Sequence, residues 1–169
     1  INALDMTEGY GDSSNPVIEK SEFVLSLFEQ LDKGGINPRA KSIIDRCVDA
    51  VYAAYSRGGP TPTLCTLREK LLEQPEEEAQ ELALSLELFA SGSLNAFAHE
   101  TNVNTRSRIV VYDIMDLGRQ LKTMGLLVIT DAMLNRVTEN WRKGKRTHLF
   151  IDEFHVVYEL SLIHISEPT

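Results

Sequence analysis

Apolar residues recur at every third or fourth position through residues 21–92, which is the spacing of amphipathic α-helices. Turn-forming residues interrupt the pattern at Gly34-Gly35, at Gly58-Gly59-Pro60 and at Gly92. The pattern therefore predicts four helices packed into a compact all-helical unit. Their expected starts are Ser21, Asn37 with Pro38 in the first helical position, Thr63 and Glu76, and the fourth helix is expected to reach Ala90.

The pattern changes in the second half of the chain. Residues 107–115 (SRIVVYDIM) contain three consecutive β-branched residues, and residues 148–152 (HLFID) form another short apolar run, so each indicates a strand. Between them, apolar residues from Leu117 to Trp141 follow helical spacing, with Asp116 as the expected cap. Strand, long helix and strand predict a right-handed crossover with both strands parallel in one sheet. Residues 1–20 are rich in turn formers and are expected to be a loop that follows a strand ending near Ile1.

The second predicted strand runs directly into two adjacent acids, Asp152 and Glu153. Ligands of parallel sheets bind beyond the carboxyl ends of the strands, so both acids are expected at that edge. There an aspartate can hold Mg²⁺, directly or through water, and a neighbouring glutamate can polarise the water that attacks a γ-phosphate. The alternative is an exposed strand end on which both acids are structural. The loop sequence G-x-x-x-x-G-K-[ST], which binds phosphates in many NTPases, does not occur in the 169 residues.

Four segments together resemble the conjugative-transfer ATPases of type IV secretion systems, the CagE/TrbE/VirB class. The resemblance implies an α/β fold, in which a partial RecA-like P-loop NTPase sheet of parallel strands carries an all-helical insertion and the chain is mostly helical overall. The segments are INALDM (1–6), EKSEFVLSLFEQL (19–31), SRIVVYDIMDLGRQLKTMGLLVITDAMLNRV (107–137) and THLFIDEFHVVYE (147–159).

The resemblance also implies a division of the chain. Residues 1–20 would be the end of a sheet strand and a loop, residues 21–92 the helical insertion, and residues 93–159 the second part of the RecA-like domain, with the Walker B motif. Residues 160–169 (LSLIHISEPT) look like a non-native read-through tail. The chain is therefore expected to be an internal fragment of a longer protein.

THLFIDEF resembles Walker B, which makes Asp152 the expected magnesium-coordinating and nucleotide-binding acid and Glu153 the expected catalytic acid, with ATP and Mg²⁺ as cofactors. Family members commonly have small and aromatic residues after the acid pair, whereas this chain has Phe154-His155, so the role of His155 stays open. Without a phosphate-binding loop, the chain alone is not expected to hydrolyse ATP.

For the full-length protein, the resemblance implies a hexameric ring that is peripheral at the cytoplasmic face of the bacterial cell membrane. Its expected partners are other type IV secretion components at the inner membrane, with DNA as a further candidate. Two other functions fit the residues. One is an FtsK- or HerA-like DNA translocase of the same RecA-like group. The other is a non-enzymatic module whose helical unit binds partners.

Composition and charge narrow these alternatives. The formal net charge of −8 argues against a free-standing nucleic-acid-binding domain. The basic strip, residues 142–146 (RKGKR), is expected to cap a helix, and contact with DNA, membrane phosphates or a partner is the alternative. Cys47 and Cys65 have no metal-ligand spacing and are expected to be buried thiols in a reduced compartment. No apolar run approaches the ~18 residues of a membrane span, so a soluble, cytoplasmic chain is expected.

Two further places carry polar residues of interest. Asp113, at the end of the first predicted strand, could line the same cleft as the acid pair or cap the turn toward Asp116. Thr101, Asn102 and Asn104 could include a polar sensor or serve as turn residues.

Overall fold

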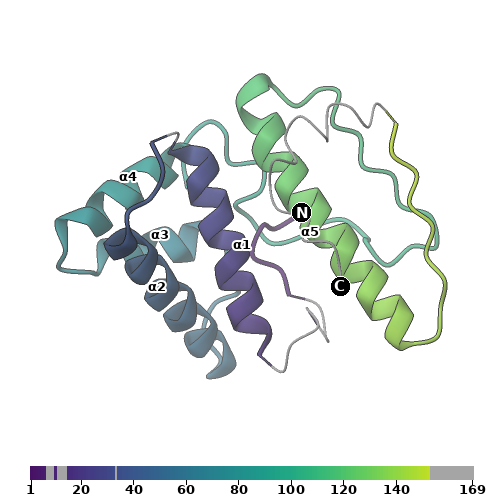
Figure 1. The fold of residues 1–169 in the computed structure, drawn as a ribbon, viewed down its shortest axis with the longest axis horizontal. Helices are drawn as coiled ribbons and strands as arrows, with labels where there is room; N and C mark the ends of the chain where they lie inside the picture. The colour runs from purple at the N-terminus through teal and green to yellow at the C-terminus, as the bar shows by residue number, and fades with distance from the viewer. Residues whose placement is uncertain (7–9, 11–14, 33, 153–169) are drawn as a thin grey trace.

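The fold is built from helices. The computed structural model describes residues 1–6, 10, 15–32 and 34–152, and within these the only regular secondary structure is helical (Figure 1). Helix α1 packs on α2, α2 on α3, and α3 on α4, which gives a four-helix body, whereas α5 lies to one side against α1. The helices are α1 (Pro16–Leu31), α2 (Pro38–Ser56), α3 (Leu64–Leu72), α4 (Glu77–Ala90) and α5 (Arg119–Arg142).

The predicted parallel sheet, and with it the RecA-like α/β fold, is wrong for the described part of the chain. Neither residues 107–115 nor residues 147–152 form a strand there. Val111 is 83% exposed and Phe150 is 94% exposed, so these apolar runs are not covered. A strand becomes stable when a neighbour pairs its backbone and another layer covers its apolar face. The described residues offer neither to these two runs, so their β-branched composition does not produce a sheet.

The N-terminal segment is also not a strand. Residues 2–5 form a tight turn, in which Asp5 N donates to the Asn2 carbonyl at 3.3 Å. Ala3 and Leu4 in this turn are almost completely buried. The Tyr52 hydroxyl of α2 donates to the Leu4 carbonyl at 2.6 Å, and Ala3 N donates to the Phe97 carbonyl at 3.0 Å. The turn thus connects the helical body to the segment that leads toward α5.

Three of the predicted helix starts are confirmed. Asn37 caps α2 with Pro38 at the first position, Thr63 caps α3 through a capping box, and α4 begins within one residue of Glu76. The predicted start of the first helix at Ser21 is wrong, because Asn15 caps α1 and Pro16 occupies its first position. The same Asn-Pro pair that marks α2 therefore also marks α1.

The start of the last helix was predicted two residues early. Gly118, and not Asp116, is the N-cap of α5, which spans 24 residues and ends at the basic strip as expected.

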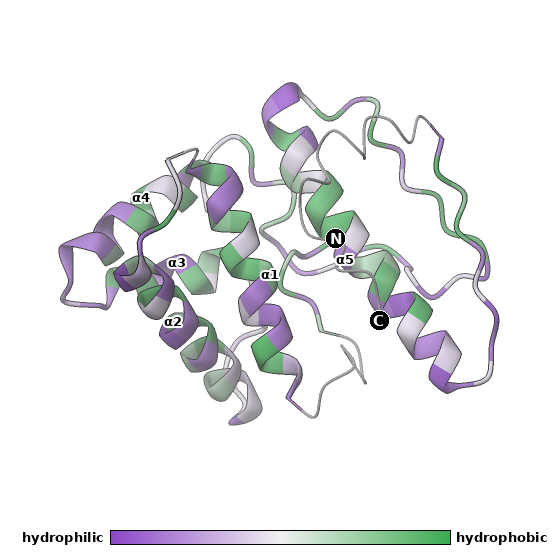
Figure 2. Ribbon diagram, viewed as in Figure 1, coloured by the Kyte–Doolittle hydropathy of each residue, from purple (hydrophilic) through white to green (hydrophobic). Residues whose placement is uncertain are grey.

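The core lies between α1, α2, α3 and α4, where their apolar faces meet. Figure 2 shows hydrophobic and hydrophilic residues alternating along these helices, and the buried ones are the hydrophobic members of the core. Each fully buried leucine, isoleucine or phenylalanine contributes about 1.5–3 kcal/mol through its removal from water. The largest apolar side chains that are completely buried are Leu4, Leu27, Phe28, Ile44, Leu64, Leu67, Leu71 and Leu86.

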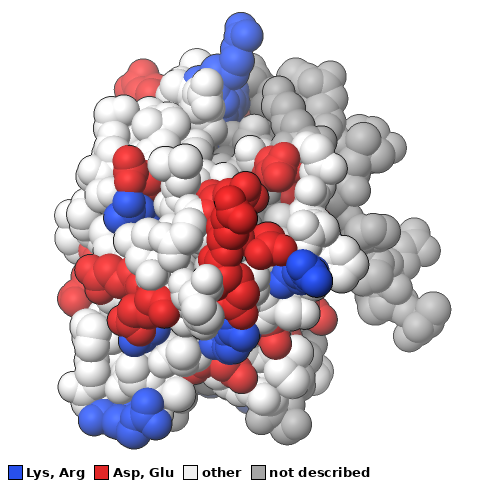
Figure 3. Space-filling model, turned by 90° about the vertical axis from the view of Figure 1, so that its left-hand side faces the viewer, with Lys and Arg blue, Asp and Glu red and all other residues white. Residues whose placement is uncertain are grey.

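Charged side chains are spread unevenly over the surface. Figure 3 shows the face at the left of Figure 1, over α2 and α4, where acidic side chains gather with a few cations among them. Some of these charges form exposed pairs, such as Arg46 with Glu76 at 2.7 Å and Arg39 with Glu78 at 3.3 Å. Exposed pairs of this kind contribute less than about 1 kcal/mol each, so this face is acidic in character and not a major source of stability.

Both cysteines are free thiols, as predicted, but only Cys47 is buried, whereas Cys65 is partly exposed. Burial raises the pKa of the Cys47 thiol to about 11 from its ordinary value of 9.0. The pKa of this thiol is higher in the folded chain than in the unfolded chain. The protonated thiol therefore stabilises the fold fully below pH 9, and this stabilisation is lost as the pH rises through 11.

The free energy of unfolding in urea, measured with reductant present, should therefore fall between pH 8 and pH 10 by about 1 kcal/mol more in the wild type than in Cys47→Ala. The matched control is Cys65→Ala. Because Cys65 is only half-buried, its loss should change the pH dependence of the free energy of unfolding less than the loss of Cys47 does. Parallel profiles for the wild type and Cys47→Ala would show that the Cys47 thiol does not contribute this dependence.

Candidate functional site

The structure describes one of the two acids that the sequence singled out. Asp152 lies at the end of the segment that follows the basic strip, and its side chain is exposed. Glu153 and His155 lie outside the described residues. Among the residues that the structure describes, no three His, Cys, Asp or Glu side chains are grouped so that they could hold a metal ion.

Mg²⁺ often takes only one or two protein carboxylates and completes its coordination with water and phosphate oxygens. An exposed carboxylate such as Asp152 therefore fits a magnesium ion that is shared with a nucleotide. It does not by itself make a metal site. A nucleotide would also need groups that bind its phosphates, and the sequence contains no phosphate-binding loop of the G-x-x-x-x-G-K-[ST] type.

Two of the other polar candidates, Asp113 and Asn104, serve as turn residues. The Asp113 carboxylate accepts from Met115 N at 2.9 Å, which confirms the capping alternative for this acid. The Asn104 amide oxygen accepts from Arg106 N at 2.9 Å in the same manner. Neither residue lines the pocket described next.

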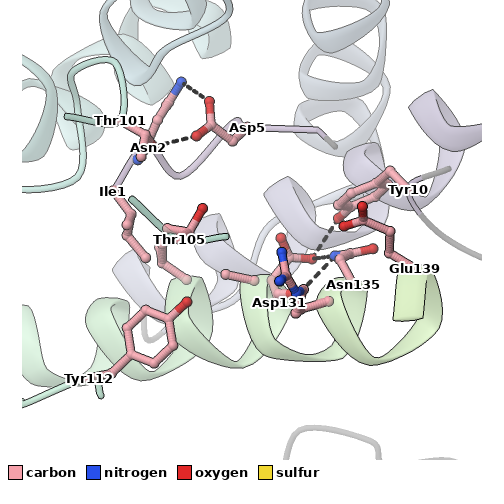
Figure 4. A pocket seen from close by; sticks show the side chains of 13 residues that line it. Ile1, Asn2, Asp5, Tyr10, Thr101, Thr105, Tyr112, Asp131, Asn135 and Glu139 are labelled. Atoms are coloured by element: carbon pink, nitrogen blue, oxygen red, sulfur yellow. Dashed lines mark hydrogen bonds between the residues drawn. The ribbon is translucent and has the colours of Figure 1, made fainter. Parts of the chain in front are cut away.

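The structure brings together a different set of polar residues in a pocket between the N-terminal segment, residues 101–112 and α5 (Figure 4). The cavity has a volume of about 70 Å³, which is room for a few water molecules. Its polar lining includes Asn2, Asp5, Thr101, Asp131 and Asn135.

A buried ion pair lies beside this pocket and joins α1 to α5. Lys20 of α1 is completely buried, and its Nζ lies 2.9 Å from Oδ2 of Asp131 on α5. The same ammonium lies 3.4 Å from the Ala3 carbonyl oxygen, and 4.3 Å from the centre of the Tyr10 ring. The Tyr10 hydroxyl donates to Oδ1 of Asp131 at 2.5 Å. We call Tyr10, Lys20, Asp131 and Asn135 the polar joint.

Burial sets the protonation behaviour of the polar joint. Loss of hydration lowers the pKa of Lys20, and the charge of Asp131 opposes this shift. Burial, with the nearby Asp131 carboxylate, raises the pKa of Tyr10 well above its usual range. Tyr10 therefore stays a hydrogen-bond donor to Asp131. The Asn135 amide also donates to Asp131 Oδ1, at 3.2 Å, so this carboxylate has three partners in the joint.

A second polar cluster holds the N-terminal turn on the other side of the pocket. The Asn2 amide donates to Asp5 Oδ1 at 3.0 Å and to the Pro62 carbonyl at 2.7 Å. Asn2 N donates to the Thr101 hydroxyl at 2.8 Å, and that hydroxyl donates to the Asp5 carboxylate. Thr101 therefore fixes the turn, and its hydrogen bonds give it a structural role.

Sequence reasoning missed the polar joint, although the sequence carries a signal for it. Lys20 lies one helical turn before Val24 on the buried face of α1, whose other members are Ser21 and apolar residues. Asp131 and Asn135 continue the buried face of α5 that begins with Met124 and Val128. Charged residues on the buried faces of two helices indicate an ion pair between them, because an unpaired charge there is unfavourable.

Comparison of this chain with protein-family models, with curated proteins and with solved structures gives no match.

Proposed function

We propose that this chain supplies the acidic side of a magnesium–ATP site in an ATPase that energises conjugative DNA transfer through a type IV secretion system. The observation that carries the proposal is the acid pair Asp152-Glu153, which directly follows the apolar run Leu149–Ile151 in a segment that resembles Walker B. The exposed Asp152 carboxylate supports it, because a metal-bound nucleotide could reach this side chain from solvent.

The two acids would have different roles. Asp152 would hold Mg²⁺, directly or through water, and the ion would neutralise charge on the β- and γ-phosphates. Glu153 would accept a hydrogen bond from the attacking water and so orient it toward the γ-phosphate. The phosphates would be held by a loop outside these 169 residues, so the chain alone would bind ATP weakly and not hydrolyse it.

The proposal extends to the setting of the protein. The full-length ATPase would form a hexameric ring at the cytoplasmic face of the membrane, with other type IV secretion components as partners. Among the described residues, no helix combines the length and the apolar character that crossing a membrane requires.

A second candidate function is a non-enzymatic helical module. It is favoured by the exposed large apolar residues outside the helical body, since contiguous exposed apolar groups often mark a surface for a protein partner. In this case Asp152 and Glu153 would both be structural. The exposed apolar residues are Ile109, Val111, Met115, Leu149, Phe150 and Ile151.

Substitution of Asp152 separates the two candidates. In the full-length protein, Asp152→Asn should raise the Mg²⁺ concentration needed for half-maximal ATP hydrolysis by about tenfold or more, because loss of a metal partner commonly weakens binding by that factor. The matched control is Asp113→Asn, which changes another exposed acid after an apolar run. An unchanged magnesium dependence in Asp152→Asn would favour the helical module.

A further inference from the structure

The chain has two electrically different parts. Residues 1–92 contain eight Lys and Arg against sixteen Asp and Glu, a formal charge of −8, and residues 93–152 contain nine against six, a formal charge of +3. The acidic face over α2 and α4 belongs to the first part (Figure 3). A charge asymmetry of this kind is typical of proteins that bind a polyanion through one region only.

Four of the nine cations of the second part lie in the basic strip, which begins at Arg142, the last residue of α5. Arg142, Lys143, Lys145 and Arg146 are all exposed. The backbone between them is folded in a defined way, since Gly144 has a φ of +67° and Lys145 N donates to the Asn140 carbonyl at 2.8 Å. The Asn140 amide also donates to the Thr147 hydroxyl at 2.9 Å. The chain therefore turns back at the helix end and holds the cations in one place.

Two aromatic side chains flank the basic strip and are exposed to solvent. Trp141 is 73% exposed and Phe150 is 94% exposed. The two residues between the basic strip and Leu149 are the polar Thr147 and His148. Exposed aromatic rings beside a line of cations form the arrangement on which nucleic-acid bases stack while their phosphates contact lysine and arginine.

One acid pairs with a cation of the basic strip, and further cations lie against α5. The single acid in the last two turns of α5, Glu139, is mostly buried and pairs with Lys143 at 2.5 Å. The Arg136 guanidinium donates to the Arg106 carbonyl at 3.1 Å, which brings the segment with Arg106 and Arg108 against α5. Both of these arginines are exposed.

We propose that the basic strip, with Trp141 and Phe150, is a binding surface for single-stranded nucleic acid. The phosphates would lie along the cations, and bases would stack on the two rings. The structure favours this ligand over an anionic membrane, because α5 is only weakly amphipathic and the two rings are separated by polar residues, whereas a membrane-bound helix presents a continuous apolar face. The proposal involves neither Asp152 nor ATP hydrolysis, so it is independent of the proposed ATPase activity.

Trp141 is the only tryptophan in the chain and so reports directly on the surface. Titration of the complete chain with oligo-dT of about 20 nucleotides at low salt should quench its fluorescence, because a base stacks on the indole. The logarithm of the association constant should fall with the logarithm of the salt concentration with a slope of about −2 to −3, as expected for three or four phosphate contacts on a single strand.

The double variant Lys145→Ala/Arg146→Ala should bind labelled oligo-dT, followed by anisotropy, about tenfold or more weakly at low salt, and its salt slope should be smaller in magnitude by about 1.4. The control Arg39→Ala/Arg57→Ala removes two exposed cations from the ends of α2 and should bind like the wild type. Trp141→Ala should also weaken binding, and because the side chain is exposed it should leave the unfolding transition unchanged.

Three results would overturn the proposal. The first is that oligo-dT neither quenches Trp141 nor changes the anisotropy at low salt. The second is that the strip variant and the α2 control lose affinity equally, which would indicate general electrostatic attraction. The third is that vesicles containing phosphatidylglycerol shift the Trp141 emission to shorter wavelength while oligo-dT has no effect, which would assign the surface to a membrane.

Discussion

Replacement of Lys20 by methionine is expected to destabilise the folded chain by about 2–4 kcal/mol, one of the two largest effects that we predict. Methionine has nearly the same length and apolar stem as lysine, so the core should stay filled. The substitution removes the ammonium that pairs with Asp131 at 2.9 Å and leaves that carboxylate with the Tyr10 and Asn135 hydrogen bonds. The side chain of Asp131 is slightly exposed, which keeps the expected loss below that of a completely buried unpaired charge.

Lys41→Met is the matched control for this variant. Lys41 pairs with Glu29 at 2.7 Å, but both side chains are nearly half exposed, so its loss should change the free energy of unfolding by less than about 1 kcal/mol. Urea unfolding followed by circular dichroism measures both variants. If Lys20→Met is no more harmful than Lys41→Met, the polar joint does not contribute to the stability of the fold.

The double variant Lys20→Met/Asp131→Leu tests the reason for the loss. It replaces the ion pair with apolar groups and leaves no unpaired charge, so it should recover much of the stability that Lys20→Met loses. A double variant that is no more stable than Lys20→Met would show that an unpaired Asp131 carboxylate is not the reason for the loss.

The polar joint also bears on the arrangement of the molecule. It lies between α1 of the helical body and α5, the helix that carries the basic strip and leads to Asp152 (Figure 1). The residues proposed to bind nucleic acid and nucleotide lie at the C-terminal end of α5 or beyond it in the chain. The position of α5 on the helical body, fixed in part by Lys20 and Asp131, therefore decides where these residues are presented.

Local sequence signals predicted the helices of the first half well. The caps Asn37 and Thr63 satisfy backbone N–H groups at the helix starts, and the apolar stripes of α3 and α4 are buried as expected. These features act within a few residues, so they can be recognised without knowledge of the rest of the fold. The predicted start of α1 at Ser21 is wrong because the pair Asn15-Pro16, a local signal of the same kind, begins the helix.

The two predicted strands show what the sequence could not decide. The apolar runs at Ile109–Val111 and Leu149–Ile151 are compatible with strands, but a strand depends on a partner that no local pattern supplies. In the described structure both runs are exposed and unpaired as strands. The polar joint was missed for a related reason. Lys20 and Asp131 are 111 residues apart, and only the folded chain reveals that they meet.

The proposed ATPase activity depends on Glu153 more than on any other residue. In the full-length protein, Glu153→Gln keeps the size and the hydrogen-bonding capacity of the side chain but removes its negative charge. Loss of a group that orients and polarises the attacking water typically lowers the rate by about 100- to 10,000-fold, whereas binding of ATP does not require the carboxylate. We therefore expect hydrolysis to be nearly abolished and nucleotide affinity to be retained. Glu159→Gln, a nearby glutamate outside the acid pair, is the matched control and should hydrolyse ATP at the wild-type rate.

The most direct test of the proposed function is a paired measurement of ATP binding and steady-state hydrolysis for the full-length wild type and Glu153→Gln. The proposal predicts equal affinities for ATP and a hydrolysis rate at least about 100-fold lower in the variant. A variant that hydrolyses ATP at the wild-type rate, or a wild type that does not hydrolyse it, would contradict the assignment of this acid pair to a nucleotide site.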